Sequence, residues 1–266
     1  MKKKIALLLS VAMAATLCLA GCGSKSGDAS KEEKKVYAVE SGSAGEKVAK
    51  EKKWKINSVT SQADALMEVK SGTSDAAIID LLMAGAMIGE GTSYPDLKYT
   101  DQLTTEEYGI GCRKGSDLVS YINAFLADTY STGEMKKVAE KYGVQEALVE
   151  QKECQYEAAK SDSDVEYIKE KGDLVVGITE FEPMDYQDKD KNWIGFDADM
   201  ASLLAEKLGV KVKFVVIDWD TKAMELDSKN LDVVWNGMTL TDEVKNAMDC
   251  TNAYCNNAQV VVVPSK

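Results

Sequence analysis

The stretch Leu174-Val175-Val176-Gly177-Ile178 is an apolar run of strand length, and it begins the pattern that decides the fold. An amphipathic helix pattern follows over residues 196–208, and Gly209 stands directly after it, where many helices end in a left-handed residue. Residues 212–216 form a second β-rich run. A strand, a helix and a strand in this order predict an α/β fold with mainly parallel sheets.

The same alternation extends outward over the rest of the chain. Further predicted strands are residues 36–39, 76–79, 108–113, 231–235 and 259–263. Further predicted helices are residues 63–69, 81–88, 118–130, 134–142, 165–171 and 224–226. Residues 145–160 are polar and low in apolar periodicity, so we expect a linker or a frayed helix there.

Composition limits the classes of function. The chain has 266 residues, which is ample for two lobes, and its net charge is −12. Such an acidic chain is a poor partner for nucleic acid, because basic side chains are needed to neutralise phosphates. The absence of histidine excludes Ser-His and Cys-His catalysis and histidine-ligated metals. Arg113 is the one arginine, so a bidentate arginine clamp on a carboxylate can form only there.

The N-terminus has the pattern of an export signal. Three lysines at residues 2–4 precede an apolar run over residues 5–20, which is short for a membrane span. The run closes with Leu19-Ala20-Gly21-Cys22, which resembles the lipobox of bacterial lipoproteins. We therefore expect residues 1–22 to be a lipoprotein signal peptide, Cys22 to be lipidated, and the exported protein to be anchored to the membrane. Residues 23–35 are rich in Ser, Gly, Lys and Glu and predict a disordered tether.

Two predicted strands end in residues suited to binding a small solute. Residues 36–39 lead into Ser41-Gly42-Ser43-Ala44-Gly45-Glu46 and a helix, and free backbone N–H groups at a helix start can bind an anion. Ser43 and Glu46 also fit a capping box, so both interpretations stay open. Asp80 follows the strand 76–79, where it can meet a ligand ammonium or cap the next helix.

Residues 172–263 resemble the first lobe of the amino-acid-binding family of periplasmic solute-binding proteins. The motifs that carry this resemblance are Phe181-Glu182-Pro183-Met184, Gly195-Phe196-Asp197, Glu206-Lys207-Leu208-Gly209-Val210, Asp218-Trp219-Asp220 and Asn236-Gly237-Met238-Thr239-Leu240-Thr241-Asp242-Glu243-Val244. Residues 36–143 resemble the rest of the same family, through the segments 40–46, 75–80, 107–111 and 137–143.

The resemblance implies a two-lobed, periplasmic-binding-protein-like α/β fold with two mixed sheets and a hinge of two crossings. What is usually the second half of the family comes first in this chain, and we interpret this order as a circular permutation. Lobe two is then residues 36–107 and 258–266, and lobe one is residues 108–257. Within lobe one, residues 144–164 join the family's usual ends.

The resemblance also implies a ligand site between the lobes. The implied ligand-binding residues are Phe181, Trp219, Asn236, Gly237, Met238 and Thr239 of lobe one, and Ser43, Ala44, Gly45 and Asp80 of lobe two. Phe181 and Trp219 would enclose the ligand, or else belong to the core, where Trp235 is expected. Asp80 would take the ligand's ammonium.

Val244 departs from the family, which has an arginine there to hold the ligand's carboxylate. In this chain the carboxylate would need the helix start at Ser43 and the region of Thr239, or the ligand would be an amine without it. Cys112, Cys154, Cys250 and Cys255 allow three complete disulfide pairings, and Cys250 is expected as a buried thiol. Neither a metal nor another cofactor is predicted.

The function implied by the resemblance is that of a substrate-binding lipoprotein, not an enzyme. It would capture a small polar amine-bearing solute, first of all an amino acid, and deliver it to the permease of an ABC importer. Two alternatives stay open. One is a dehydratase-like enzyme on a small carboxylate, with Glu180, Glu182 and Asp185 available as acids or bases. The other is a receptor that reports its ligand to a membrane sensor.

Overall fold

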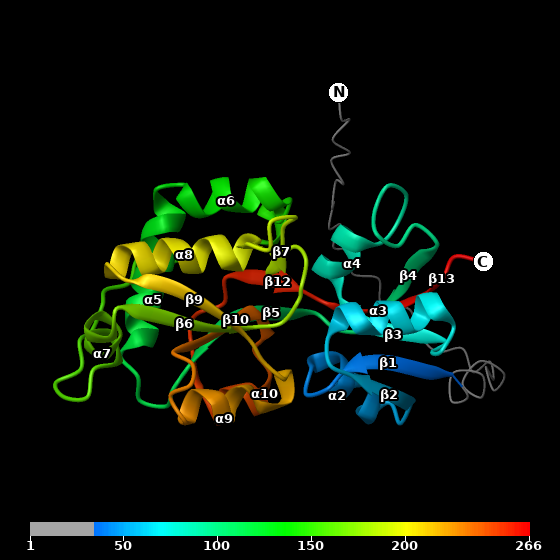
Figure 1. The fold of residues 1–266 in the computed structure, drawn as a ribbon, viewed down its shortest axis with the longest axis horizontal. Helices are drawn as coiled ribbons and strands as arrows, with labels where there is room; N and C mark the ends of the chain where they lie inside the picture. Colours follow the sequence, from blue (N-terminus) through cyan, green and yellow to red (C-terminus); the bar gives the residue numbers. More distant parts are fainter. Residues whose placement is uncertain (1–34) are drawn as a thin grey trace, which may run out of the picture.

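Two β-sheets divide the described chain, residues 35–266 of the computed structural model, into two lobes that lie side by side (Figure 1). We call the lobe built on the five-stranded sheet the small lobe, and the lobe built on the six-stranded sheet the large lobe. The predicted two-lobed α/β architecture with mixed sheets is thereby confirmed. The predicted signal peptide, the lipidation site Cys22 and residues 23–34 of the predicted tether lie outside the described residues.

The small lobe has the strand order β2-β1-β3-β13-β4. The central strand β3 is buried at every residue, which its sequence Ala-Ala-Ile-Ile-Asp suits. Parallel pairs join β1 to β2 and β3, whereas β13 is antiparallel to β3 and β4. The strands are β1 (Val36–Glu40), β2 (Lys55–Val59), β3 (Ala76–Asp80), β4 (Leu97–Gln102) and β13 (Gln259–Pro264). The helices are α2 (Ala44–Glu51), α3 (Gln62–Ser71) and α4 (Leu81–Met87).

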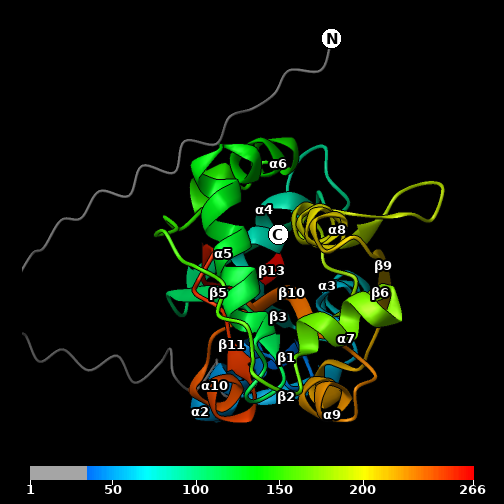
Figure 2. The same cartoon turned by 90° about the vertical axis from the view of Figure 1, so that its left-hand side faces the viewer.

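The large lobe has the strand order β11-β5-β10-β6-β9, and β12 also pairs with β5. Both views place α6 and α8 on one side of this sheet and α9 and α10 on the other (Figures 1 and 2). The strands are β5 (Glu106–Cys112), β6 (Asp173–Ile178), β9 (Lys211–Val216), β10 (Val233–Thr239), β11 (Asp249–Cys250) and β12 (Cys255–Asn257), with a separate hairpin of β7 (Tyr186–Gln187) and β8 (Trp193–Ile194). The helices are α5 (Leu118–Ser131), α6 (Glu134–Tyr142), η1 (Gln145–Ala147), α7 (Asp164–Lys171), α8 (Phe196–Leu208), η2 (Trp219–Thr221), α9 (Lys222–Asp227) and α10 (Asp242–Ala247).

The chain passes between the lobes twice, and the two passages are adjacent. The first leads from β4 into β5, and the second leads from β12 into β13. β5 and β12 are antiparallel partners, and the Leu103 N–H donates to the Gln259 carbonyl over 2.7 Å. Two adjacent short passages form the kind of connection about which lobes rotate in hinge closure.

Three strand predictions need correction. The strand predicted at residues 231–235 lies two to four residues later, at Val233–Thr239, because its end pairs with β5 as far as Tyr108. The strands β2 and β4 were not predicted, since their exposed, polar residues give no apolar run. The expectation of mainly parallel pairing is wrong, because both passages return the chain as antiparallel strands.

The predicted linker after residue 144 is largely irregular but well attached. After the short helix η1, no helix or strand occurs from residue 148 to residue 163. The carboxylate of Asp117 accepts hydrogen bonds from the end of this segment and the start of α7, donated by the Tyr156 and Ser163 hydroxyls and the Ala159, Asp164 and Val165 N–H groups. These bonds lower the pKa of Asp117 although its partial burial acts in the opposite direction.

Arg113 has a structural role in the large lobe. Its guanidinium donates to the Asp164 carboxylate from Nη2 over 2.9 Å and from Nε over 3.2 Å, and Asp232 lies 3.6 Å away. It also donates to the Leu231 carbonyl. All three charged side chains are almost fully buried, so Arg113 fastens α7 to the sheet and is not free to bind a solute.

We predict that Arg113→Met lowers the free energy of unfolding by about 3–5 kcal/mol, because Asp164 and Asp232 lose a buried cationic partner. Urea denaturation monitored by circular dichroism measures the effect. The matched control is Lys169→Met, which removes a largely exposed pair with Glu166 and should cost less than about 1 kcal/mol. Equal losses in the two variants would contradict the structural role of Arg113.

Candidate functional site

A cavity of about 570 Å³ lies between the lobes, at the ends of β1 and β3 on one side and of β10 on the other. From the small lobe its wall includes Glu40, Gly42, Ser43, Ala44, Gln62 and Asp80. From the large lobe it includes Phe181, Trp219, Asp220, Lys222, Asn236, Gly237, Met238, Thr239 and Val244. The cavity has the size of a site for a small molecule.

The structure brings the residues singled out from the sequence together around this cavity, with the exception of Gly45. Trp219 and Asp80, which lie on different lobes, both face the same cavity. Gly45 is absent from the cavity wall, because α2 packs there on the sheet of the small lobe. A Cβ at this position would stand 3.1 Å from the Ile78 carbonyl oxygen and 2.9 Å from Gln259 Oε1.

The two aromatic residues of the wall are held by different neighbours. Phe181 meets Tyr108 edge to face, with ring centres 6.3 Å apart, and lies against Gly237. Trp219 is 7% exposed, and the ammonium of Lys222 lies 4.7 Å from its ring centre. Trp235 has no exposed surface, as expected of a core residue.

The start of α2 is closed by a capping box. The Ser43 hydroxyl accepts the Glu46 N–H over 3.1 Å, and the Glu46 carboxylate accepts the Gly42 N–H over 3.0 Å. Glu46 also pairs with Lys50. The capping interpretation therefore applies, and a negative charge from the chain itself already lies at this helix start.

Asp80 occupies the N-cap position of α4 but does not cap it with its side chain. Its carboxylate instead accepts hydrogen bonds from the Tyr108 hydroxyl over 2.8 Å and from Gln259 Nε2 over 2.9 Å. The amides of Gln62 and Asn257 donate to it as well. The residue is 3% exposed, so this network is almost entirely shielded from water.

Sequence reasoning missed several residues of the wall, among them Glu40, Gln62 and Lys222. Glu40 ends β1 as Asp80 ends the neighbouring parallel strand β3, and this shared position was a usable signal. Lys222 gave no signal, because a lysine beside a helix start is usually solvated. Its ammonium donates to the Trp219 carbonyl over 2.9 Å and, across the cleft, to the Gly42 carbonyl over 3.1 Å.

Burial dominates the electrostatics of the cavity wall. Burial and the negative charge of Asp80 raise the pKa of Glu40 to about 8, although Lys222 acts in the opposite direction. Burial and the charge of Glu106 likewise raise the pKa of Asp80 to about 8. Burial lowers the pKa of Lys222. The wall thus concentrates acidic groups that are costly to ionise without a cation beside them.

The wall offers no arginine to a carboxylate. Val244 is 9% exposed and lines the cavity where the resemblance calls for arginine, and Arg113 is engaged elsewhere. The polar groups that the large lobe contributes to the wall include Asn236, Lys222 and Thr239, whose hydroxyl donates to Glu106 over 2.9 Å.

The lobes touch across the mouth of the cleft. Lys47 of α2 forms an ion pair with Glu243 of α10, and the two helices face each other in Figure 1. Gly42 approaches Asp220 so closely that an added Cβ would stand 2.7 Å from the Asp220 Cα. These contacts belong to a closed arrangement of the lobes.

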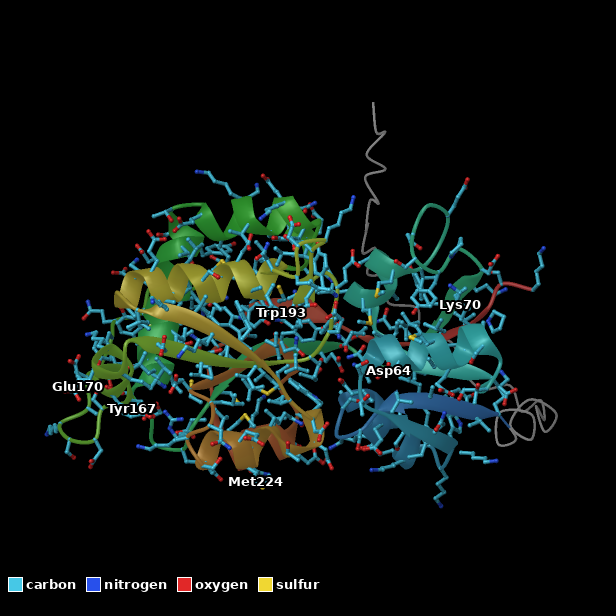
Figure 3. The ribbon with its side chains drawn as sticks, viewed as in Figure 1. Asp64, Lys70, Tyr167, Glu170, Trp193 and Met224 are labelled. Carbon is cyan, nitrogen blue, oxygen red and sulfur yellow. The ribbon has the colours of Figure 1, made fainter. Side chains whose placement is uncertain are left out.

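The acids considered for an enzyme do not share this cavity. Glu180 lines a second, more open hollow together with Asp64, and Figure 3 shows Asp64 at the end of α3 nearest the large lobe. Tyr167 and Glu170 lie on α7 at the far end of the large lobe in the same view. Asp185 has no exposed surface and accepts a hydrogen bond from Asn236.

Residues 35–266 contain four of the cysteines of the chain. The four described cysteines are free, with Cys112 and Cys255 buried. Cys250 is only partly buried, which corrects the expectation of a buried thiol. Within the same residues, no group of three acidic or cysteine side chains is arranged to hold a metal ion. The described helices include none that is long and apolar enough to cross a membrane.

We predict that the solute-free protein becomes less stable as pH rises from about 5 to 8. The pKa values of Glu40 and Asp80, and that of Asp197 at about 7, are raised by folding, so the folded state holds more protons than the unfolded state in this window. Stability contributed by these groups is complete below the unfolded pKa values near 4 and is lost as pH passes the folded ones. Urea denaturation at unit pH steps measures the trend, and a constant or rising stability would contradict it.

Residues 174–266 match the model of the family described as bacterial extracellular solute-binding proteins, family 3. The chain is 38% identical over 88 residues to the L-cystine-binding protein TcyJ of Escherichia coli (strain K12), and this match covers 33% of each chain. It is 31% identical over 83 residues to a cyclohexadienyl dehydratase of Pseudomonas aeruginosa, covering 31% of each.

Among solved structures, an ancestral cationic amino acid solute binding protein, AncCDT-1, is 40% identical over the matched part. That match covers 32% of this chain and 37% of the other, with a TM-score of 0.31. The chain therefore spans about a third of the length of the curated relatives that it matches.

Proposed function

Because residues 174–266 carry the sequence of the bacterial extracellular solute-binding proteins of family 3, we propose that the whole chain is a substrate-binding protein of an ABC importer. It captures a small polar amine-bearing solute, first of all an amino acid, by closing its two lobes. The observation that carries this proposal is the cavity between the lobes, which collects the aromatic, hydroxyl and carboxylate residues that the sequence motifs single out.

The proposed site uses both lobes. Phe181 and Trp219 provide the apolar and aromatic part of the wall, where a cationic or planar group gains about 0.5–2 kcal/mol from a ring face. Asn236, Gly237, Met238 and Thr239 offer backbone and hydroxyl groups from β10. Ser43, Ala44 and Asp80 complete the site from the small lobe, with Gly45 behind them supporting α2.

The chain order of the lobes is also part of the proposal. The family-matched segment lies at residues 174–266, after the small-lobe strands β1 to β4, and we propose that this order is a circular permutation. The irregular segment 144–164 then joins the family's usual ends, and its attachment to Asp117 supports that role. Both passages between the lobes are kept, so hinge closure is compatible with the permuted order.

Export and anchoring are proposed from the sequence alone. Residues 1–22 would direct export, Cys22 would carry the lipid, and the tether up to residue 35 would hold the lobes close to the membrane, at the cell surface or in the periplasm. A protein held there is in place to pass its solute to the permease of the importer.

A dehydratase is the second candidate, favoured by the similarity to the cyclohexadienyl dehydratase. The placement of Glu180 in a separate hollow and of Asp185 in the core weighs against it, since neither can act on a solute in the main cavity. A steady release of product from a small carboxylate incubated with the protein would favour the enzyme over the binding protein.

The decisive experiment is a thermal-shift screen against the twenty standard amino acids, L-cystine, L-ornithine and small diamines. A solute that binds the folded protein raises its unfolding temperature, by an amount that grows with concentration above Kd. We expect at least one amine-bearing solute to raise this temperature and to be recovered unchanged afterwards. A screen without any shift would overturn the proposed function.

Closure itself can be tested at Gly42. We predict that Gly42→Ala weakens binding of the solute found in the screen at least tenfold, because its Cβ would stand 2.7 Å from the Asp220 backbone and block closure. The control is Gly72→Ala, which imposes the same left-handed strain, with φ near +78°, but meets no atom within 4 Å. Calorimetry measures affinity, and small-angle scattering with solute measures compaction. Equal affinities of the two variants would contradict a role of this contact in closure.

A further inference from the structure

We infer that the ammonium of Lys222 binds the carboxylate of an amino-acid solute, and so supplies in this chain the positive charge that Val244 cannot supply. The inference rests on the proposed function and narrows its solute class to molecules that carry a carboxylate on the same carbon as the amine. The ammonium of the solute remains assigned to Asp80.

Three lysines line the cavity, and they differ in burial and in pairing. The side chain of Lys47 is 38% exposed and pairs with Glu243. The side chain of Lys50 is 60% exposed and pairs with Glu46. Lys222 is only 8% exposed, and in the described part of the chain no ion pair joins its ammonium to a carboxylate. Among these three lysines, Lys222 alone combines burial with an unpaired charge.

The ammonium of Lys222 has a donor to spare. An ammonium carries three N–H groups. Two of them donate to the carbonyls of Trp219, over 2.9 Å, and of Gly42, over 3.1 Å. Both acceptors are uncharged, and a buried ammonium without an anion beside it costs free energy. A carboxylate of the solute would accept from the remaining N–H and offset this cost.

The acids nearest to Lys222 are poor partners for its charge. Burial lowers the pKa of Lys222, and Glu40 and Asp220 oppose this shift only through space. Asp220 is exposed, so water screens its charge. The side chains of Thr179 and Gln62 hydrogen-bond to Glu40, and burial raises the pKa of Glu40 to about 8. Near neutral pH, Glu40 therefore holds its proton and leaves the ammonium of Lys222 without a counter-charge.

Two other places that the sequence offers for the carboxylate lack a free positive charge. The start of α2 holds the carboxylate of Glu46, which accepts the Gly42 N–H. The Thr239 hydroxyl donates to the carboxylate of Glu106. An entering carboxylate would meet a carboxylate of the chain at either place, whereas at Lys222 it meets an unpaired ammonium.

The fold places this ammonium on the wall that Val244 leaves apolar. Val244 and Trp219 belong to one apolar cluster of the large lobe. Lys222 begins α9 directly after the short helix η2, which carries Trp219. Its ammonium lies 4.7 Å from the centre of the Trp219 ring and donates to the Gly42 carbonyl of the small lobe. The charge is thus available where the two lobes meet around a solute.

The test measures the preference for an amino acid over its α-carboxamide, in which a neutral amide replaces the carboxylate. The probes are the twenty standard amino acids, L-cystine and L-ornithine, each beside its amide. Calorimetry at pH 6, where the amine of the amide is still protonated, measures the affinities. For the amino acids that bind the unaltered protein, we expect the amide to bind at least tenfold more weakly. Lys222→Met should reduce this preference to less than threefold, because the charge that distinguishes the two probes is gone.

The matched control is Lys245→Met. Lys245 is an exposed lysine next to Val244 that does not line the cavity, so its loss should leave the preference unchanged. Lys222→Gln is measured in parallel, so that the comparison stands if Lys222→Met does not fold. Failure of both Lys222 variants to fold would assign this lysine a structural role and overturn the inference.

The preference separates recognition of the carboxylate from closure of the lobes. If Lys222 acts only through its bond to the Gly42 carbonyl, its loss weakens the amino acid and the amide by the same factor, and the preference stays. That result, or a preference below tenfold in the unaltered protein, overturns the inference and leaves the proposed function standing. Absence of binding by every probe overturns the proposed function and this inference with it.

Discussion

The hydrogen-bond network around Asp80 is the constraint on which the arrangement of the two lobes depends. Its four donors come from α3, from β5, from β12 and from β13, and the last three strands form the two passages between the lobes. One buried carboxylate thus ties both passages to the central strand of the small lobe. Removing water from a carboxylate costs free energy, and the four hydrogen bonds together offset this cost. The network therefore fixes the relative positions of the four donors.

Much of the fold could be predicted because its central elements have strong patterns. β3, β6 and α8 are buried runs or amphipathic segments with clear ends, and Gly209 caps α8 in the left-handed conformation that the sequence indicates. Two of the elements that were missed, β2 and β4, lie at the edges of the small-lobe sheet. β4 has one buried residue in six, and such a strand is specified by its partner β13 rather than by its own sequence.

Site residues could be predicted where their position in a sequence motif is informative. Site residues that differ from other charged residues only in being buried could not be predicted. Trp219 and Asp80 follow strands and stand out in the sequence, and both line the cavity. Glu40 and Lys222 resemble the many solvated glutamates and lysines of the chain, and only the structure shows that both are buried. The role of Asp80 could not be read from its motif either, because its donors lie 18 to 179 positions away along the chain.

Burial of charge also links the solute to closure under the proposed function. With the lobes in this arrangement Glu40 and Lys222 are buried, and burial shifts the pKa of each in the direction that neutralises it. An empty closed protein must therefore either hold an extra proton on Glu40 or keep an unpaired charge. A cationic solute removes this penalty, whereas an uncharged solute leaves it. A ligand shifts the equilibrium between open and closed lobes only by binding one of these states more tightly than the other. Because a cationic solute favours the closed lobes more than an uncharged solute does, the closed state can report that a cation is bound.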